Sequence, residues 1–414
     1  MQMKILEMEN KEDIVIVGAG IAGLSTSLGL YRLGLRSLVL ESSDGLRVSG
    51  FALTLWTNAW RALDVLGVGD CLREQHFRID GLQTTSLATG LQTSERPLKG
   101  RTKRNHGDHE IHCVRRNILL ETLAKELPHG TIRYNSKVVS IEESGCFKLV
   151  HLADGSILRT KVLIGCDGVN SVVANWLGLP KRAPSGRSSI RGLAEYTNGH
   201  CFGAKFSLYF GDGVRFGFLP CNQTSVYWFF TFTPSTQGGE QLEANQVKMK
   251  EFVLSKLARV PQAAGIVKNT TLDSISSASL KFRLPWNLLW GDISKGNVCV
   301  SGDALHPMTP DIGQGGCSAL EDSVVLARCL SEALTTHSKQ GTPQEEYDRI
   351  KKGLEKFARE RRWRSFELIS TAYLVGSIQQ SDATVISFLR EKLLSGFFGY
   401  ILLKIADFDC GNLY

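Results

Sequence analysis

Residues 13–23 read DIVIVGAGIAG, an apolar run rich in β-branched residues that leads directly into a GxGxxG loop. The apolar run predicts a buried strand, and residues 21–34 have the apolar spacing of a helix. Residues 37–41 (SLVLE) predict a second strand. Strand, helix and strand in such close succession require a parallel pair joined by a crossover helix. The segment therefore predicts an α/β fold of the Rossmann type.

The glycine loop and the acidic residue beyond it form the first candidate binding site. In such loops the first glycine permits a tight turn, the second admits a pyrophosphate, and the third lets the helix pack on the strand. The helix N-terminus favours phosphate, and an acid ending the second strand is positioned to bind a ribose. We predict dinucleotide binding, without yet choosing FAD or NAD, by Gly18, Gly20, Ile21, Ala22, Gly23 and Glu41.

Composition and charge narrow the class of partner. The chain has 414 residues, 43% hydrophobic and 21% charged, which is ordinary for a globular protein of two or three domains. Segments 96–116 and 181–191 contain seven and four Lys or Arg, against two acidic residues in the first and none in the second. A net charge of +7 without a nucleic-acid motif argues against nucleic acid. A small anionic molecule is the better match.

The sequence also carries an expectation about location. Residues 1–13 lack the apolar core of a signal peptide, and the ten cysteines include no CxxC pair, which fits reduced thiols. The late apolar run at 393–403 is too short to span a bilayer. We therefore predict a cytoplasmic protein without integral membrane association, present as a monomer or a homodimer.

Two further strand ends carry residues suited to a flavin. Residues 162–168 (VLIGCDG) predict an apolar strand ending in Asp-Gly. Residues 297–323 (NVCVSGDALHPMTPDIGQGGCSALEDS) predict a strand, a glycine-rich loop and a helix. Asp303 is positioned to hold a hydroxyl of a sugar or ribityl chain, and the glycines let a flat ring lie against backbone. The helix N-terminus can stabilise negative charge on that ring, as on a reduced flavin.

These motifs, GAGIAG at 18–23, CDG at 166–168 and GDALHPMTPDIGQGG at 302–316, occur in an order and at separations that are specific together. The sequence resembles the single-component FAD-dependent aromatic-ring monooxygenases, of which p-hydroxybenzoate hydroxylase and salicylate hydroxylase are type members. Within GQGGCSALED it is most similar to plant FAD-dependent monooxygenases. The resemblance implies FAD as cofactor and NADPH or NADH as co-substrate. It also implies insertion of one oxygen atom from O₂ into a small aromatic or electron-rich substrate through a flavin C4a-hydroperoxide.

The resemblance also implies roles for individual residues. Arg47 matches an arginine near the flavin ring, and Pro310 matches a proline beside the reactive carbon of the flavin; these are the two implied catalytic positions. Asp167 matches an aspartate linked to both FAD and NADPH. The implied cofactor-binding residues are Gly18, Gly20, Ile21, Ala22, Gly23, Glu41, Arg47, Arg116, Val138, Asp167, Gly302, Asp303, Pro310, Gly313, Gly315 and Gly316.

The chain departs from the family pattern at two positions. Cys317 stands where members often have asparagine, and Ala174 stands where they often have arginine. The second departure removes a group implied in binding the pyridine nucleotide. Arg182 or Arg187 in the nearby basic segment is a hypothetical substitute.

The motifs predict a discontinuous domain arrangement. The expected FAD-binding domain consists of 1–75, 105–184 and 285–340, and a C-terminal helical region covers 341–414. Segments 76–104 and 185–284 form an inserted substrate domain, a mainly antiparallel sheet that roofs the flavin. The candidate pocket residues of that sheet are Tyr209, Phe216, Phe218, Tyr227, Trp228 and Phe230.

Several alternatives stay open at this stage. A reductase or dehydrogenase of the same fold would use no oxygen, and a non-catalytic flavin-binding protein would not turn over. His106, His109 and His112 are spaced by three, but no carboxylate or cysteine pattern completes a metal site, so no metal is expected. His306 is expected to pack in its loop rather than to act as a base. The substrate, the regiochemistry and the choice among hydroxylation, epoxidation and Baeyer–Villiger insertion stay undetermined.

Overall fold

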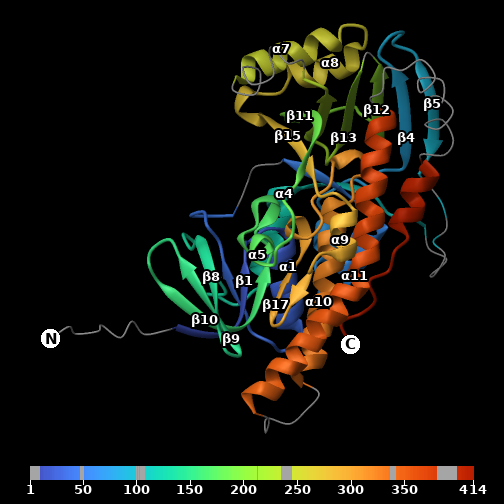
Figure 1. Ribbon diagram of the computed structural model, residues 1–414. Coiled ribbons are helices and arrows are strands. Elements are labelled where there is room, and N and C mark those ends of the chain that lie inside the picture. The colour runs from blue at the N-terminus through green and yellow to red at the C-terminus, as the bar shows by residue number, and fades with distance from the viewer. Residues whose placement is uncertain are drawn as a thin grey trace.

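The computed structural model describes residues 10–46, 51–98, 100, 102, 108–211, 213–234, 245–335, 342–379 and 399–414. Two large sheets organise the described residues, one above the other in Figure 1, and the long helix α11 (Pro343–Gln379) runs beside both. The mixed α/β fold that the sequence predicts is confirmed.

The first sheet contains the predicted strand–helix–strand unit. Its central strand β1 (Asn10–Val17) pairs in parallel with β2 (Leu38–Leu40) on one side and with β10 (Ile157–Gly165) on the other, and Val15 and Ile16 in β1 are fully buried. A hairpin of β8 (Val138–Ser144) and β9 (Phe147–Leu152) extends from β10. The main path in spatial order is β16 (Ser294–Lys295), β17 (Val298–Val300), β10 (Ile157–Gly165), β1 (Asn10–Val17), β2 (Leu38–Leu40) and β7 (Ile132–Arg133).

Two of the helices beside this sheet pack against each other through small residues. The Oγ atoms of Ser25 in α1 (Ile21–Arg32) and Ser323 in α10 (Gly315–Thr335) are 2.6 Å apart, and a Cβ on Gly29 would lie 2.9 Å from Ala327, so the two helices approach closely. The helices of this part are α1 (Ile21–Arg32), α2 (Thr57–Leu66), α3 (Gly69–Arg73), α4 (Arg116–Lys125), α5 (Val172–Trp176), α9 (Trp286–Trp290) and α10 (Gly315–Thr335). A two-stranded ribbon pairs β3 (Ala52–Leu55) with β6 (His112–Arg115).

The second sheet is mainly antiparallel, as the aromatic strands predict. Strands β12 (Lys205–Gly211) and β4 (Gly81–Ser86) form its one parallel pair among the described residues. Its spatial order is β15 (Ile275–Phe282), β11 (Ala183–Glu195), β14 (Ser225–Phe232), β13 (Val214–Pro220), β12 (Lys205–Gly211), β4 (Gly81–Ser86) and β5 (Gln92–Pro97). Helices α7 (Gln246–Lys256) and α8 (Pro261–Lys268) cover one face of it.

The C-terminal part is helical, as predicted, and then returns to the first sheet. The segment 399–414 buries Leu402, Ile405 and Leu413 in the same core as α1 and α10. Of the apolar run at 393–403, residues 393–398 lie outside the described residues. Across the described residues, no helix combines the length and the apolar character that crossing a membrane requires. All ten cysteines are free thiols.

Candidate active site

In the glycine loop between β1 and α1, Gly18 and Gly23 are in tight contact with neighbouring backbone, whereas Gly20 borders open space. A Cβ atom on Gly18 would lie 2.5 Å from the carbonyl oxygen of Cys166, and one on Gly23 would lie 1.9 Å from that of Gly18. Apart from its two neighbours in the chain, no described residue has an atom within 4 Å of the Cβ position of Gly20, and no described side chain caps α1. Uncapped N–H groups beside an open space form a binding site for phosphate.

Glu41 directly follows β2, and its carboxylate reaches back to the glycine loop. Its Oε2 accepts a hydrogen bond from the N–H of Ala19 at 2.8 Å, and its Oε1 accepts one from the N–H of Ser43 at 2.9 Å. The carboxylate is thereby held beside the open space at Gly20. A ribose attached to the phosphates would lie within its reach.

The Asp167-Gly168 turn follows β10 and packs against the other side of the loop. The Cα of Asp167 would lie 3.1 Å from a Cβ on Gly18. One carboxylate oxygen, Oδ2, accepts a hydrogen bond from the N–H of Val172 at 2.6 Å, whereas Oδ1 is buried and has no partner among the described residues. Burial raises the pKa of this carboxyl group.

A third turn, η3 (Gly302–Ala304), packs against the first turn of α1. Gly302 has a φ of +60°, and a Cβ there would lie 2.7 Å from the Cβ of Ala22. Both facts require glycine at this position. The carboxylate of Asp303 is exposed and makes no hydrogen bond with any described residue. It is therefore available to accept hydrogen bonds from a ligand.

The loop that follows joins this turn to α10. The short turn η4 (Pro310–Ile312) ends at Gly313, which has a φ of +62°. A Cβ on Gly316 would lie 2.5 Å from Leu53 in β3 and 3.6 Å from Ile21 in α1. Pro310 is exposed, so the loop rests on β3 and α1 while its proline faces outward.

An ion cluster that the sequence did not predict ties this loop to the second sheet. The buried Asp311 accepts hydrogen bonds from Arg187 of β11 at 2.8 Å and from Arg215 of β13 at 3.2 Å. Burial lowers the pKa of Arg215 to about 10, so this guanidinium stays charged at neutral pH. No local sequence pattern signals these pairs, because Asp311 lies 124 residues from Arg187 and 96 residues from Arg215.

Tyr227 and Phe229 of β14 lie on the same face of the sheet as Arg215. The register pairs Arg215 with Thr231 and Leu219 with Tyr227, so these odd-numbered positions share one face. Tyr227 packs in the core that contains the first sheet, and its hydroxyl makes no hydrogen bond with a described residue. Burial raises the pKa of its phenol to about 12, so it is a protonated donor at neutral pH.

For five of the six predicted pocket residues, the expectation was wrong. They pack with α7 and α8 in a second core cluster, which contains no residue of the first sheet. Side chains alternate between the two faces of a strand, and these five positions share the face that α7 and α8 cover, opposite to the face of Arg215. These residues are Tyr209, Phe216, Phe218, Trp228 and Phe230.

The two departures from the family pattern are both buried. The thiol of Cys317 lies 3.6 Å from the carbonyl oxygens of Gly313 and Thr54, and burial raises its pKa to about 12. Ala174 is buried in α5.

Only one of the two arginines that might replace the missing one lies near the Asp167 turn. Arg182 forms a hydrogen bond with Asn170, the last residue of the short helix η1 (Gly168–Asn170) that begins in this turn. Arg187 is instead buried and paired with Asp311.

The remaining residues predicted to bind the cofactor lie in separate parts of the chain. Arg116 starts α4, and its backbone N–H donates to the carbonyl of Phe51 at 2.8 Å. Val138 is buried at the start of β8. Arg47 lies outside the described residues.

The histidines do not form a metal site within the part of the chain that is described. His109 pairs with Thr57, and His112 contacts Glu110, while His106 lies outside the described residues. No described group of three His, Cys, Asp or Glu could hold a metal. His306 is fully buried with its Nε2 2.7 Å from Asp322, so it packs within its loop as expected.

The glycine loop, Glu41 and the Asp303 turn all lie at the carboxyl ends of the parallel strands, where open α/β sheets bind ligands. An open space at Gly20, an uncapped helix and an unengaged carboxylate at Asp303 fit the phosphates and hydroxyls of a dinucleotide. Fold and site together define an α/β protein of the dinucleotide-binding class.

Comparison with known proteins specifies the family. The family model described as "FAD binding domain" matches residues 11–351, and the chain belongs to this family of FAD-binding monooxygenases. It is 52% identical to Monooxygenase 2 of Arabidopsis thaliana over 99% of this chain and 100% of that protein. It is 37% identical to Monooxygenase 1 of the same plant over 97% and 99% of the two chains.

A solved structure shares the fold. Klebsiella pneumoniae HpxO, crystallised with FAD and uric acid, superposes with a TM-score of 0.80 at 22% identity and covers 98% of each chain. At this identity the likeness establishes the fold alone.

Proposed function

We propose that the protein is an FAD-dependent, NAD(P)H-consuming monooxygenase that inserts one oxygen atom from O₂ into a small aromatic or electron-rich molecule. The family match and the relatives named monooxygenases support the reaction class. The single observation that carries the proposal is the convergence of the glycine loop, the Asp303 turn and the Pro310 loop from distant parts of the chain.

Each part of the site has a proposed role toward the cofactor. Gly18 to Gly23 would bind the pyrophosphate, and Glu41 would bind the ribose. Asp303 would hold the ribityl chain, and Pro310 with the glycines at 313–316 would lie along the flavin ring. When bound, FAD supplies hydride acceptance from NAD(P)H and activation of O₂, while the protein orients the reactants and excludes water. Arg47, Arg116, Val138 and Asp167 stay proposed contacts from the resemblance.

We propose that the substrate lies between Pro310 and the face of the second sheet that bears Tyr227 and Phe229. Two arginines and one carboxylate meet there, which favours a substrate with a negative charge or an acidic hydroxyl. The Tyr227 phenol would donate a hydrogen bond to that group. Uric acid in the structurally similar Klebsiella protein is a ring compound of a kind suited to such a pocket.

The proposal is tested by the visible spectrum of the purified protein and by NADPH oxidation against a panel of aromatic metabolites, with and without O₂. We expect bound flavin, substrate-stimulated NADPH oxidation and a product heavier by one oxygen atom. Turnover that persists without O₂ would identify a reductase or dehydrogenase of the same fold. A flavin that NADPH never reduces would identify a non-catalytic flavin-binding protein.

Three further expectations belong to the proposal. We expect the discontinuous FAD-binding domain to contain the first sheet and the inserted substrate domain to contain the second. The protein acts in the cytoplasm, and it is a monomer or a homodimer. Fractionation and light scattering test the last two.

A further inference from the structure

Helix α10 carries two adjacent carboxylates, Glu321 and Asp322, that have no exposed surface. Arg361 of α11 donates from Nε to Asp322 at 2.6 Å and from Nη2 to Glu321 at 2.6 Å. Arg364, one turn further along α11, donates to Glu321 at 2.9 Å and is 6% exposed. These four residues form a charge-balanced group inside the protein, which we call the buried ion cluster.

The cluster touches the cofactor site through one carboxylate. While Arg361 binds Oδ1 of Asp322, Oδ2 accepts hydrogen bonds from the N–H of Gly302 at 2.8 Å and from His306 at 2.7 Å. The hydroxyl of Ser301 lies 3.3 Å from the same oxygen. Asp322 is therefore bonded to both sides of Asp303, the exposed residue in the middle of the turn.

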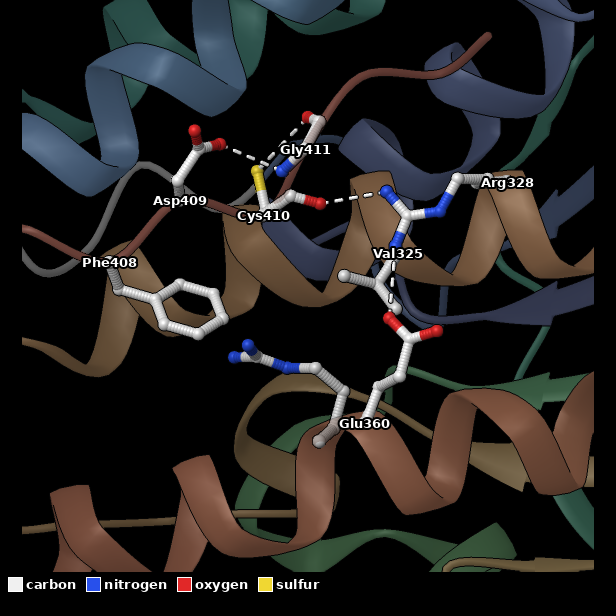
Figure 2. A pocket seen from close by; sticks show the side chains of 8 residues that line it. Val325, Arg328, Glu360, Phe408, Asp409, Cys410 and Gly411 are labelled. Atoms are coloured by element: carbon white, nitrogen blue, oxygen red, sulfur yellow. Dashed lines mark hydrogen bonds and ion pairs between the residues drawn. The ribbon is translucent and has the colours of Figure 1, made fainter. Parts of the chain in front are cut away.

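The C-terminal segment covers the outer side of the cluster. Arg364 donates to the carbonyl of Ile405 at 2.8 Å, and the ring of Phe408 lies 4.4 Å from its guanidinium carbon and 5.3 Å from that of Arg361. Phe408 also lines a cavity of about 230 Å³. Arg328, on the same cavity, donates a hydrogen bond to the carbonyl of Cys410 at 2.8 Å (Figure 2). The segment, α11 and α10 thus form one continuous set of contacts behind the turn.

A gain in the stability of the fold does not by itself explain why four charged side chains are buried here. Desolvation of a buried ion pair commonly offsets its attraction, and apolar replacements are often no less stable. An apolar pair would, however, leave the N–H of Gly302 without an acceptor. What Asp322 and Arg361 provide, and an apolar pair could not, is the hydrogen bond to the N–H of Gly302 in the turn.

We infer that Asp322 is a positioning residue of the cofactor site: it holds the Gly302–Ala304 turn so that Asp303 meets the ribityl chain of FAD, and Arg361 holds Asp322. The inference rests on the proposed function, because it assumes that Asp303 contacts FAD. It extends the site to a layer of residues that touch neither cofactor nor substrate.

A double-mutant cycle tests this coupling. FAD release on dilution of the holoenzyme gives the dissociation constant for the natural protein, Asp322→Asn, Asp303→Asn and the double variant. We expect each single change to weaken FAD binding at least tenfold. The FAD dissociation constant of the double variant should not exceed the larger of the two single-variant constants, because Asp322 acts through Asp303. Additive effects, or an unchanged constant in Asp322→Asn, would overturn the inference.

A matched control lies on the same two helices. Glu332 of α10 pairs with Lys356 of α11 at 2.6 Å, and both side chains are at least 41% exposed. Glu332→Gln removes an ion pair between these helices far from any turn of the site. Its FAD dissociation constant should equal that of the natural protein.

A second variant covers the case in which Asp322→Asn does not fold. Asp322→Leu combined with Arg361→Met removes both charges, and far-UV circular dichroism reports its folding. The folded variant should still release FAD at least tenfold more readily, with an altered visible circular dichroism of the flavin. FAD binding like that of the natural protein would overturn the inference. A natural protein without FAD would instead overturn the proposed function itself.

Discussion

Gly20 and Gly23 lie one helical turn apart and respond to different constraints. A methyl group on Gly20 would enter open space, whereas one on Gly23 would lie 1.9 Å from the carbonyl oxygen of Gly18. Gly20→Ala should keep the free energy of unfolding of the apoprotein within about 0.5 kcal/mol but weaken FAD binding at least tenfold. Gly23→Ala should lower the free energy of unfolding of the apoprotein by about 1–3 kcal/mol. Urea unfolding and FAD fluorescence measure both, and tight FAD binding by Gly20→Ala would contradict the account.

Two tyrosines on opposite faces of the second sheet provide a matched pair. Tyr227→Phe removes a donor from the proposed pocket and should lower kcat/KM for the substrate about tenfold, the value of one hydrogen bond. Tyr209 packs toward α7 and α8, with its hydroxyl 3.4 Å from Gln262. Tyr209→Phe should leave kcat/KM unchanged, and equal losses in both variants would argue against the pocket.

At this scale the sequence predicted what local motifs encode. Glu41 and Asp303 could be singled out because Glu41 directly follows a strand and Asp303 lies in the glycine turn after another. Arg187 and Arg215 could not, since their partner Asp311 lies 124 and 96 residues away. No local pattern in the chain reports an ion pair of that separation.

At the scale of elements, the Asp311 cluster joins β11 and β13 to the Pro310 loop. Asp311→Asn would leave two buried arginines without their balancing charge and should lower the free energy of unfolding by about 3–5 kcal/mol. The exposed pair of Glu95 and Lys205 in the same sheet is the control. Glu95→Gln should leave this free energy nearly unchanged, because solvent screens an exposed ion pair. Similar losses in both variants would refute a special role for the cluster.

The stabilisation that the buried ion cluster gives to the packing of α10 against α11 should be lost at acid pH. Burial alone would raise the pKa values of Glu321 and Asp322, but the neighbouring charges of Arg361, Arg364 and His306 hold both below their ordinary values. The stabilisation is therefore present above about pH 4, near the ordinary carboxyl pKa, and is lost as the pH falls further.

Urea unfolding between about pH 3 and pH 6 measures this dependence. The free energy of unfolding should fall with pH more steeply in the natural protein than in the variant with Asp322→Leu and Arg361→Met. Parallel curves would show that these carboxylates titrate normally in the folded state.

The elements themselves were more predictable than their orientation. Aromatic strands between turn residues predicted the second sheet, and apolar spacing predicted α10 and α11. The face that each strand turns to the site depends on which sheet or helix covers it, and that is a tertiary property. The aromatic residues at Phe216 and Trp228 were therefore assigned to the wrong face.

At the scale of the whole molecule, the chain passes between the two sheets more than once. Strands β4 and β5 join the second sheet long before β11 does, and β17 returns to the first. Length predicted two or three domains, but only the positions of the three motifs predicted that one binding unit is assembled from separate stretches. The substrate was not predictable, because the pocket is made by side chains that meet only in the fold.

The most direct measurement of the central claim is the mass of the product formed under ¹⁸O₂ by the FAD-containing protein with NADPH and a substrate found in the metabolite screen. The account predicts incorporation of one ¹⁸O atom per product molecule, with NADPH oxidation that depends on both substrate and oxygen. A product without the isotope, formed equally well in the absence of O₂, would contradict it.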